Sequence, residues 1–378
     1  MQATSTIREA HISAMLAERI VAGDFPSAVY LISEKGRLVF ADALGHAVVD
    51  PYRITASLGT IYDLASITKP LVTGMLCAQR IENGELTLDS AVAHYLPEFD
   101  RTDRQMITVR QLLTHTSGLP AWRPLYILAD GKRERALSVI ANEGLEYKPG
   151  TRVIYSDLGF IVLGFLLERT TGKELGQLAQ IEIIEPLNLQ HTFFNPAMAL
   201  QTGIAACETG NAYERESTRS SITAEYRNWR EHVIWGEVHD GNSYFLGGVA
   251  GHAGLFSTAT ETQLLAAQFL QRQSQLLSAA TCAQLFPRNM TEGLNEARSI
   301  SWQLAATPQS AAGPALPPNS FGHSGFTGTS CWIDPENERV FILLTNRTHA
   351  HPLPFININS VRREFHSLAT AALTLQTN

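Results

Sequence analysis

The chain has 378 residues, of which 44% are hydrophobic and 17% charged, and this composition excludes an intrinsically disordered protein. Its net charge of −7 excludes the basic surface typical of nucleic-acid-binding proteins, so we expect no nucleic-acid partner. No apolar run approaches the roughly eighteen residues that a membrane-spanning helix needs, so we expect no membrane span.

Charged residues interrupt the N-terminal segment, where a secretory signal would need a continuous apolar core. We therefore expect a cytoplasmic protein, although a chain whose signal had been trimmed away would look the same and would be periplasmic. The cysteines are far apart and share no metal-ligand spacing, so we expect no disulfide framework, no metal and no cofactor. They are Cys77, Cys207, Cys282 and Cys331.

The N-terminal part predicts a helix and then two strands joined by a tight turn, over residues 7–21, 27–32 and 37–43. The stretch 62–71 then opens an apolar helix that continues to residue 82. Pro70 is tolerated in the first turn of a helix but not in its interior, so Ser66 must lie close to the helix start.

The middle of the chain has a mostly helical pattern as far as residue 200. Residues 210–235 are polar and carry several aromatic side chains, and we interpret them as a long excursion over a cleft. Thr108, Asp157 and Thr260 are the predicted caps of three of the helices. The helices are expected over residues 108–113, 133–142, 158–169, 175–184 and 260–273.

The C-terminal part predicts three strands and a closing helix, over residues 301–305, 329–333, 339–345 and 358–375. Short turns join the strands, so the sheet should be antiparallel. The predicted fold class is α+β, an antiparallel sheet flanked by N- and C-terminal helices and interrupted by a mostly helical domain. We place the sheet domain in residues 1–75 and 290–378, the helical domain in residues 76–289, and the active site in the cleft between them.

Ser66 and Lys69 form the pattern from which we infer chemistry. A serine hydroxyl needs a neighbouring group to take its proton, and residues three apart share one face of a helix. The free N–H groups at a helix start also suit a developing oxyanion. A serine at this place could instead be a simple helix cap. Two later segments favour the catalytic interpretation, Tyr155-Ser156-Asp157 and His323-Ser324-Gly325, the latter just before a predicted strand.

The order and spacing of these segments resemble the serine β-lactamase and penicillin-binding-protein superfamily, and within it the branch of class C β-lactamases and DD-peptidases. That family shows Ser-x-x-Lys, then Tyr-x-Asn, then Lys-Thr-Gly or His-Thr-Gly. The resemblance runs from residue 25 to residue 350 and implies a β-lactamase/transpeptidase-like fold. It includes Leu112–Leu119, Lys148–Gly150, Gly254–Thr258 and Gly322–Gly328.

The resemblance also implies the catalytic roles. Ser66 is the expected nucleophile, and Lys69 and Tyr155 are expected to carry its proton to the leaving group. A phenol has an ordinary pKa near 10, so Tyr155 could act as a base only if nearby cations favoured its phenolate. The backbone N–H groups of Ser66 and Phe326 would form the oxyanion hole.

Asp157, His323, Ser324 and Gly325 are the expected substrate-binding residues, and Gly325 would lack a side chain because substrate lies against the strand edge. Asp157 stands where the family has Asn and cannot donate to a substrate amide. It either pairs with Lys69, holding it charged and weakening it as a base, or simply caps a helix. His323 replaces the commoner lysine and, when neutral, offers no charge to a substrate carboxylate, which lowers the expected turnover of β-lactams.

Several further residues have side chains that could take part in chemistry. His115 resembles a structural residue of the family. His239-Asp240 and His252 flank a glycine-rich loop, but their spacing fits no zinc site, so His252 is expected on a loop that lines the cleft. The stretch 322–326 ends in Phe326 and lacks the final glycine of a nucleophile elbow, which excludes an α/β-hydrolase.

We therefore expect a serine hydrolase that forms an acyl-enzyme with a small-molecule amide or ester. Candidate substrates are peptidoglycan-derived peptides or amides, β-lactams as a weak activity, and simple esters. One alternative is a peptidoglycan-fragment amidase or a D-aminopeptidase-type recycling enzyme. An alternative of another class is a penicillin-binding-like module that binds its ligand without turnover.

Overall fold

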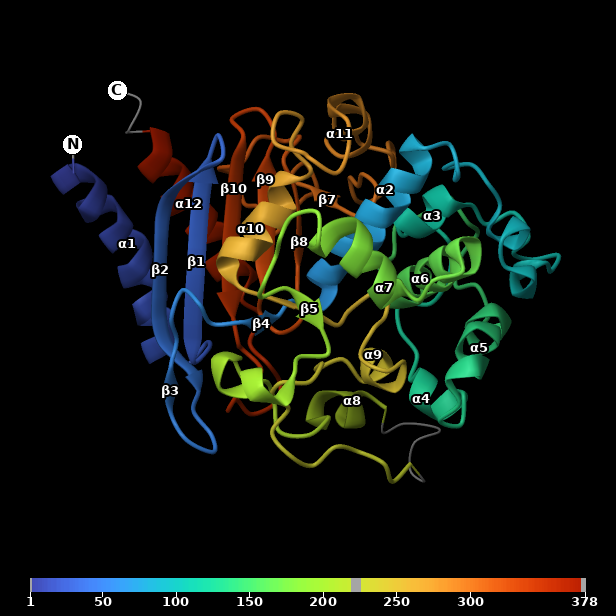
Figure 1. Ribbon diagram of the computed structural model, residues 1–378, viewed down its shortest axis with the longest axis horizontal. Coiled ribbons are helices and arrows are strands. Elements are labelled where there is room, and N and C mark those ends of the chain that lie inside the picture. The colour runs from blue at the N-terminus through green and yellow to red at the C-terminus, as the bar shows by residue number, and fades with distance from the viewer. Residues whose placement is uncertain (1, 219–225, 375–378) are drawn as a thin grey trace.

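The computed structural model describes residues 2–218 and 226–374, and its centre is a seven-stranded antiparallel sheet (Figure 1). The strands follow the spatial order β3-β2-β1-β10-β9-β8-β7. The fold class expected from the sequence is confirmed. The strands are β1 (Ser27–Glu34), β2 (Arg37–Val48), β3 (Ile54–Thr55), β7 (Gln303–Leu304), β8 (Phe321–Ser324), β9 (Ser330–Asp334) and β10 (Arg339–Thr345).

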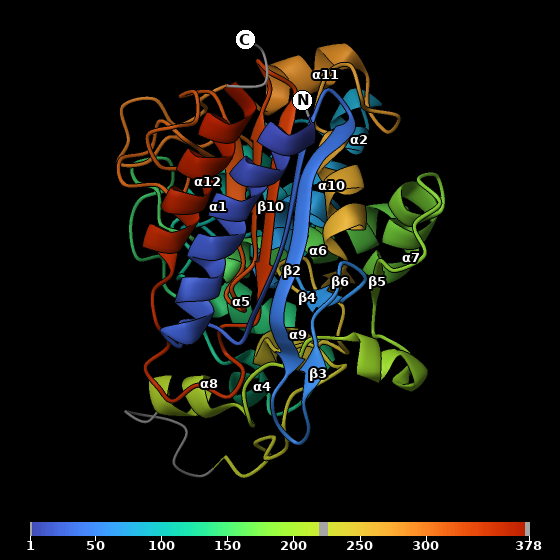
Figure 2. The same cartoon turned by 90° about the vertical axis from the view of Figure 1, so that its left-hand side faces the viewer.

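The two ends of the chain meet in the middle of this sheet. Strand β1 pairs with β10 in a register that runs from Ala28 opposite Thr345 to Glu34 opposite Arg339. Both strands are buried on both faces, which is why each is a continuous apolar run in the sequence. Helices α1 (Gln2–Val21) and α12 (Asn359–Thr374) lie side by side on one face, and α10 (Ala259–Ala267) covers the other (Figure 2).

The serine-bearing segment leads away from the edge of a second, three-stranded sheet of order β4-β6-β5. Strand β4 (Tyr62–Asp63) is followed by a 3-10 turn (Ala65–Ile67), a π-helical segment (Lys69–Gly74) and α2 (Met75–Glu82). Pro70 lies in the first turn of the π-helical segment, where its missing N–H breaks no hydrogen bond. Ser66 therefore lies at the start of this helical stretch, as predicted.

The remaining helices surround α2 and α6 on the side away from α1 and α12 (Figure 1). None of the described helices has both the length and the apolar character that crossing a bilayer requires. The helices of this part are α3 (Val109–Leu113), α4 (Leu125–Leu128), α5 (Ala136–Asn142), α6 (Asp157–Thr171), α7 (Leu175–Ala179), α8 (Ala212–Ser217), α9 (Gly241–Phe245) and α11 (Ala279–Leu285). Strands β5 (Phe193–Phe194) and β6 (Leu255–Ser257) complete the second sheet.

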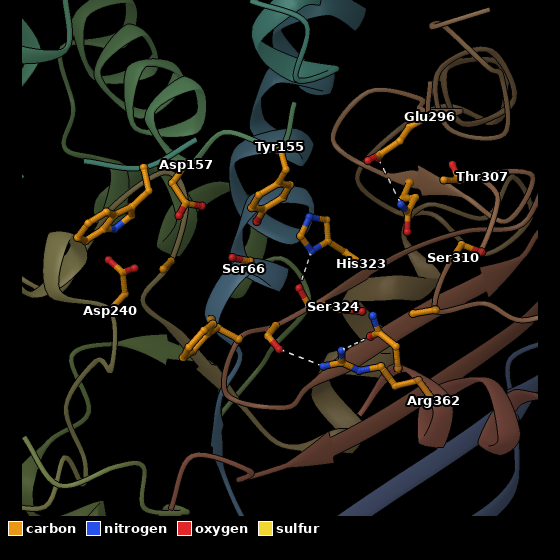
Figure 3. A pocket seen from close by; sticks show the side chains of 18 of the residues that line it. Ser66, Tyr155, Asp157, Asp240, Glu296, Thr307, Ser310, His323, Ser324 and Arg362 are labelled. Atoms are coloured by element: carbon orange, nitrogen blue, oxygen red, sulfur yellow. Dashed lines mark hydrogen bonds between the residues drawn. The ribbon is translucent and has the colours of Figure 1, made fainter. Parts of the chain in front are cut away.

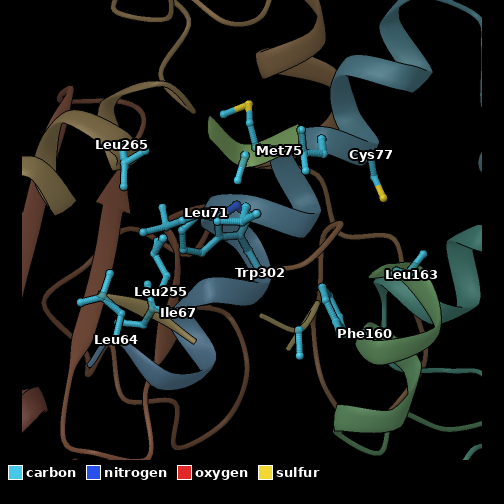
Figure 4. Packing of buried hydrophobic residues seen from close by; sticks show 14 of the residues in the cluster. Leu64, Ile67, Leu71, Met75, Cys77, Phe160, Leu163, Leu255, Leu265 and Trp302 are labelled. Carbon is cyan, nitrogen blue, oxygen red and sulfur yellow. The ribbon is translucent and has the colours of Figure 1, made fainter. Parts of the chain in front are cut away.

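The largest hydrophobic core is continuous from the sheet into the helical part. Ile67 and Leu71 of the serine-bearing segment belong to it together with Leu163 of α6 and Leu265 of α10 (Figure 4). Helix α10 falls within residues 76–289, yet it packs on β1, β9 and β10. The sheet and the helices thus share one core, and the domain boundaries expected at 75/76 and 289/290 stay a prediction.

Two local predictions are wrong, and one strand is missing from the predicted elements. Thr258, not Thr260, caps α10, because its extended backbone lets the side chain accept a hydrogen bond from Glu261. Ser156, not Asp157, caps α6 in the same way, and Asp157 is the first helical residue. His323 stands before strand β9, as predicted, but it also belongs to β8, a strand that the sequence does not predict; pairing with β9 overrides the weak strand propensity of this glycine-containing stretch.

Other boundaries hold more closely. Thr108 caps α3 as predicted, with its side chain bound to the amide of Gln111. The strand expected over 301–305 shortens to the two residues of β7. Residue 375 of the expected closing helix and residues 219–225 of the expected excursion lie outside the described part of the chain.

Candidate active site

A cavity of about 860 Å³ lies where the start of the serine-bearing helix meets the end of strand β8 (Figure 3). Residues from the helical part form one of its walls, and residues from β7, β8 and α12 form the other. Most of the predicted site residues line it: Ser66, Tyr155, Asp157, His323, Ser324, Gly325 and Phe326. Lys69 is fully buried beneath Ser66, and His252 lies behind Lys69.

Ser66 is held in a turn with unusual backbone geometry. Ala65 has φ +48°, a left-handed conformation that is uncommon for a residue with a Cβ atom and is often found at functional sites. The amide of Ala65 donates to Asp63 Oδ1 at 2.8 Å, which holds the turn. The Ser66 hydroxyl caps no helix; it accepts a hydrogen bond from Lys69.

Lys69 Nζ makes three polar contacts. It lies 2.9 Å from Ser66 Oγ, 2.7 Å from Asp157 Oδ1 and 3.0 Å from the carbonyl oxygen of His252. Burial lowers the pKa of the Lys69 ammonium, but the negative charge of Asp157, with Tyr155 beside it, outweighs burial and leaves that pKa above its ordinary value. Lys69 is therefore protonated in the resting site.

Tyr155 lies beside this pair. The Lys69 ammonium is 4.8 Å from the centre of the Tyr155 ring. The Tyr155 hydroxyl is buried and has no hydrogen-bond partner of good geometry among the described residues. Burial raises the pKa of the phenol, and the positive charge of Lys69 only partly offsets this effect. Tyr155 therefore keeps its proton in the resting site and is better placed to give a proton than to take one.

His323 is neutral. Burial, with the positive charges of Lys69 and Arg298, holds its pKa well below its usual range. Its Nδ1 is 2.9 Å from the carbonyl oxygen of Ser324, which can only accept, so Nδ1 carries the hydrogen and Nε2 offers a lone pair. The His323 ring lies 5.6 Å from the Tyr155 ring, so it borders the reacting centre without bringing a positive charge.

The two amides expected to form the oxyanion hole lie on segments that side-chain hydroxyls tie together. Thr327 donates to the carbonyl of Asp63 at 2.8 Å, and Thr329 donates to the carbonyl of Leu64 at 3.0 Å. Both threonines are buried. Among residues 2–218 and 226–374, the backbone N–H groups of Ser66 and Phe326 make no backbone hydrogen bond outside their own helix or strand, so both can serve an oxyanion.

Gly325 is required for a reason other than the predicted one. A Cβ atom at this position would lie 2.0 Å from Thr329 Oγ1, 2.5 Å from the carbonyl oxygen of Leu64 and 3.3 Å from the Cβ of Ala65. The missing side chain therefore lets the loop after β8 approach the Ser66 turn, rather than making room for substrate. The buried guanidinium of Arg362 holds the same loop from the other side by donating to the carbonyls of Gly325 and Thr329.

Replacing either clamping threonine by valine is expected to lower kcat/KM by about tenfold to a hundredfold, because the loss of an oxyanion-hole donor itself costs about 10²–10³. The effect should fall on kcat and on the affinity for a boronic acid, which mimics the tetrahedral intermediate, and should leave KM nearly unchanged. Steady-state kinetics and boronate inhibition of Thr327→Val and Thr329→Val measure it.

Thr329→Ser keeps the hydroxyl and should retain most of the activity. Thr262→Val is the matched control, since Thr262 is equally buried and donates to the carbonyl of Thr258 at 2.7 Å in α10, away from the cavity. If Thr329→Val and Thr262→Val lose the same small fraction of activity, the clamp has no special part in positioning the amides.

The glycine-rich loop supports Lys69 through its backbone. His252 offers its carbonyl to Lys69, while its ring Nε2 lies 2.8 Å from Asp240 Oδ1. His239 pairs separately with Glu208 at 2.9 Å. Within the described chain, no three or more His, Cys, Asp or Glu side chains are arranged to hold a metal.

Several cavity residues were not predicted as site residues from the sequence. Arg298, Arg347 and Arg362 line the wall near β8 and α12, and Asp240 and Glu214 line the opposite wall. Burial and the charge of Asp240 raise the pKa of Glu214 to about 7. Apart from Asp240, these side chains stand in stretches without a motif, so only the fold brings them to the cavity.

The helix-flanked antiparallel sheet and the contact between Ser66 and the buried Lys69 form the arrangement that the motifs suggested. Residues 10–361 match the β-lactamase family, and the chain belongs to that family. The resemblance seen in the sequence is thereby confirmed.

Two relatives have names that concern cell-wall peptides. A provisionally named D-alanyl-D-alanine carboxypeptidase of Escherichia coli (strain K12) is 32% identical over 354 residues, which cover 86% of this chain and 79% of that protein. The N-acetylmuramyl-L-alanine amidase of Bacillus subtilis (strain 168) is 30% identical over 364 residues, which cover 88% of this chain and 80% of that protein.

Solved structures agree with this fold. EstCE1, described as a hydrolase with promiscuous acyltransferase activity, matches with a TM-score of 0.72 at 23% identity over 98% of both chains. A class C β-lactamase matches with a TM-score of 0.70 at 15% identity, also over 98% of both chains. At these identities the likeness establishes the fold and not the reaction.

Proposed function

We propose that the protein is a serine hydrolase that forms an acyl-enzyme at Ser66 with a small-molecule amide or ester. The observation that carries this proposal is the 2.9 Å contact between Ser66 Oγ and the buried Lys69 Nζ, at the floor of a cavity. A nucleophile within hydrogen-bonding reach of a proton-transfer partner is the arrangement that covalent catalysis needs.

The geometry supports the following reaction. Ser66 Oγ attacks the substrate carbonyl while its proton passes by way of Lys69 toward the leaving group. The amides of Ser66 and Phe326 bind the oxygen on which negative charge develops. The protonated Tyr155, beside Lys69, lies where it can donate to the leaving nitrogen or oxygen. Water then attacks the acyl-enzyme, its proton passes by way of the same groups to Ser66 Oγ, and the bond between Oγ and the acyl group breaks to release the product.

The walls of the cavity favour a polar substrate. Carboxylates of Asp157, Asp240 and Glu214 line one side. The guanidinium groups of Arg298 and Arg362 line the other, where Glu296 pairs with Arg298. A peptide-like molecule that carries both amino and carboxyl groups can meet both signs of charge. The neutral His323 provides no cation beside the serine, which disfavours rapid turnover of β-lactams.

A peptidoglycan-fragment amidase or D-aminopeptidase-type enzyme is the second candidate. The mixed charges of the cavity and the names of the curated relatives support it. It differs from the first candidate only in the substrate, so a comparison of muramyl-peptide amides, D-amino-acid amides and simple esters separates the two.

Incubation with a fluorescent penicillin and with nitrophenyl esters, followed by intact-protein mass measurement and peptide mapping, tests the proposal. We expect a single acyl adduct on the peptide that contains Ser66, with the ester turning over faster than the penicillin adduct is released. The absence of both an adduct and hydrolysis with every acyl donor would leave a module that binds ligand without turnover.

A further inference from the structure

Oxygen atoms of three residues surround the buried ammonium of Lys69. Lys69 Nζ donates hydrogen bonds to Ser66 Oγ at 2.9 Å and to the carbonyl oxygen of His252 at 3.0 Å, and it forms an ion pair with Asp157 Oδ1 at 2.7 Å. Its side chain is fully buried, so water cannot take part. Lys69 therefore cannot accept the proton of Ser66 until one of its own protons has moved to a neighbour.

Only one of these three neighbours can take that proton. A serine hydroxyl and a peptide carbonyl are both too weakly basic, whereas the Asp157 carboxylate is a proton acceptor in the closest of the three contacts. Asp157 also lines the cavity, and its side chain is 17% exposed there.

The other titratable groups around Lys69 are engaged differently. Tyr155 keeps its own proton, because burial raises the pKa of its phenol. His323 is a poor acceptor, because burial and the charges of Lys69 and Arg298 depress its pKa. The ring of His252 is bound to Asp240 and turns only its backbone carbonyl to Lys69.

The backbone holds Asp157 firmly in this position. Its amide donates to the carbonyl of Ala121 at 2.8 Å. The preceding Ser156 donates from its hydroxyl to the carbonyl of Pro120 at 2.7 Å and accepts from the amide of Gly159 at 3.2 Å. A carboxylate fixed so closely to the ammonium is a built contact and not a mobile surface ion pair.

We propose that Asp157 completes a Ser66–Lys69–Asp157 proton relay and that it promotes acylation rather than restraining it. Lys69 passes one proton to Asp157 and takes the proton of Ser66 while the bond from Oγ to the substrate carbonyl carbon forms and the carbonyl electron pair moves onto its oxygen. When the bond to the leaving group breaks, Lys69 gives a proton to the leaving atom, directly or through Tyr155. Asp157 then returns its proton to Lys69.

This inference rests on the proposed acyl-enzyme and assigns Asp157 as a positioning residue that acts through Lys69. It differs from the expectation that pairing weakens Lys69 as a base. The two schemes make opposite predictions for Asp157→Asn, which keeps the shape of the side chain but cannot hold a proton as a carboxylate does.

We expect Asp157→Asn to lower the rate of ester acylation by about a hundredfold or more, the lower end of the range for proton-transfer catalysis. The loss should persist across the pH range in which the chain stays folded. Asp157→Glu retains the carboxylate and should recover activity to within about tenfold of wild type, a rescue that a merely structural role does not predict. Stopped-flow kinetics over pH, with melting temperatures for each variant, provide the measurement.

Asp89→Asn is the matched control, since it removes a carboxylate from an exposed ion pair with Arg110 at 2.9 Å and should leave acylation unchanged. The relay would be overturned if the Asp157→Asn enzyme acylated as fast as wild type or faster, and if its pH–activity profile were shifted to lower pH. That result would show that Asp157 only holds Lys69 charged. If wild type itself forms no Ser66 adduct, the proposed function fails instead. If Asp157→Asn does not fold, a Glu variant as inactive as Lys69→Met overturns the relay.

Discussion

Ser66→Ala is expected to reduce hydrolysis of any acyl donor by about 10⁴-fold or more, the scale on which removal of a serine nucleophile acts in other serine hydrolases. The Ser66 hydroxyl accepts a hydrogen bond from Lys69 and caps no helix, so its loss should scarcely change the melting temperature. Initial rates with a nitrophenyl ester, together with the mass of the protein after incubation, measure the effect.

Ser138→Ala is the control, because Ser138 is exposed on α5 and its hydroxyl donates to the backbone carbonyl of Arg135. Its activity should equal that of wild type. Substantial turnover by Ser66→Ala, or an adduct that maps to another residue, would contradict the assignment of Ser66 as nucleophile.

Lys69→Met is expected to reduce acylation by about a thousandfold, within the range of about 10²–10⁴ for proton-transfer groups. Lys69→Arg should be almost as inactive, although it keeps a positive charge beside Asp157, because a guanidinium does not give up its proton in proteins. Single-turnover kinetics of both variants, with melting temperatures to confirm folding, measure the rates.

The arginine variant separates two roles of Lys69. Fast acylation by Lys69→Arg would mean that Lys69 acts only through its charge and exchanges no proton with Ser66. A chain with Lys69→Met should also lose stability, since the partly buried carboxylate of Asp157 would lose its cation. Control measurements on the surface pair of Arg110 and Asp89 should show little change in melting temperature.

The contact between Ser66 and Lys69 could be predicted because it is local. Residues three apart near the start of a helix face the same side, and the structure places their polar atoms 2.9 Å apart. The antiparallel arrangement of the C-terminal strands could be predicted for the same reason, since their short turns permit no crossover.

The role of Asp157 could not be predicted from its neighbours in the sequence. Its position before an apolar helix was equally consistent with two roles, a helix cap and an ion-pair partner of Lys69. The structure resolves the ambiguity because Ser156 takes the capping position, and the first turn of α6 then directs Asp157 to Lys69. Such a contact depends on how two helices pack, and neither stretch of sequence contains that information.

For Gly325, the sequence predicted a close contact but not the group that makes it. The glycine itself signalled a close approach, but the partner is the backbone around Leu64 and not a substrate. Thr327 and Thr329 hold the loop after β8 against this backbone through hydrogen bonds to residues more than 260 positions earlier in the chain. A glycine in the sequence indicates that another group approaches the backbone closely, but only the tertiary structure identifies that group.

The fold class, the nucleophile and its lysine thus follow from the sequence, because strand turns, helix starts and i to i+3 spacing act over a few residues. The charges around Ser66 do not. Lys69 is kept protonated by Asp157, His323 is kept neutral by burial and by Lys69 and Arg298, and charged groups of both signs line the cavity. These properties depend on burial and on charges from distant segments, so they arise only once the helices have packed against the sheet.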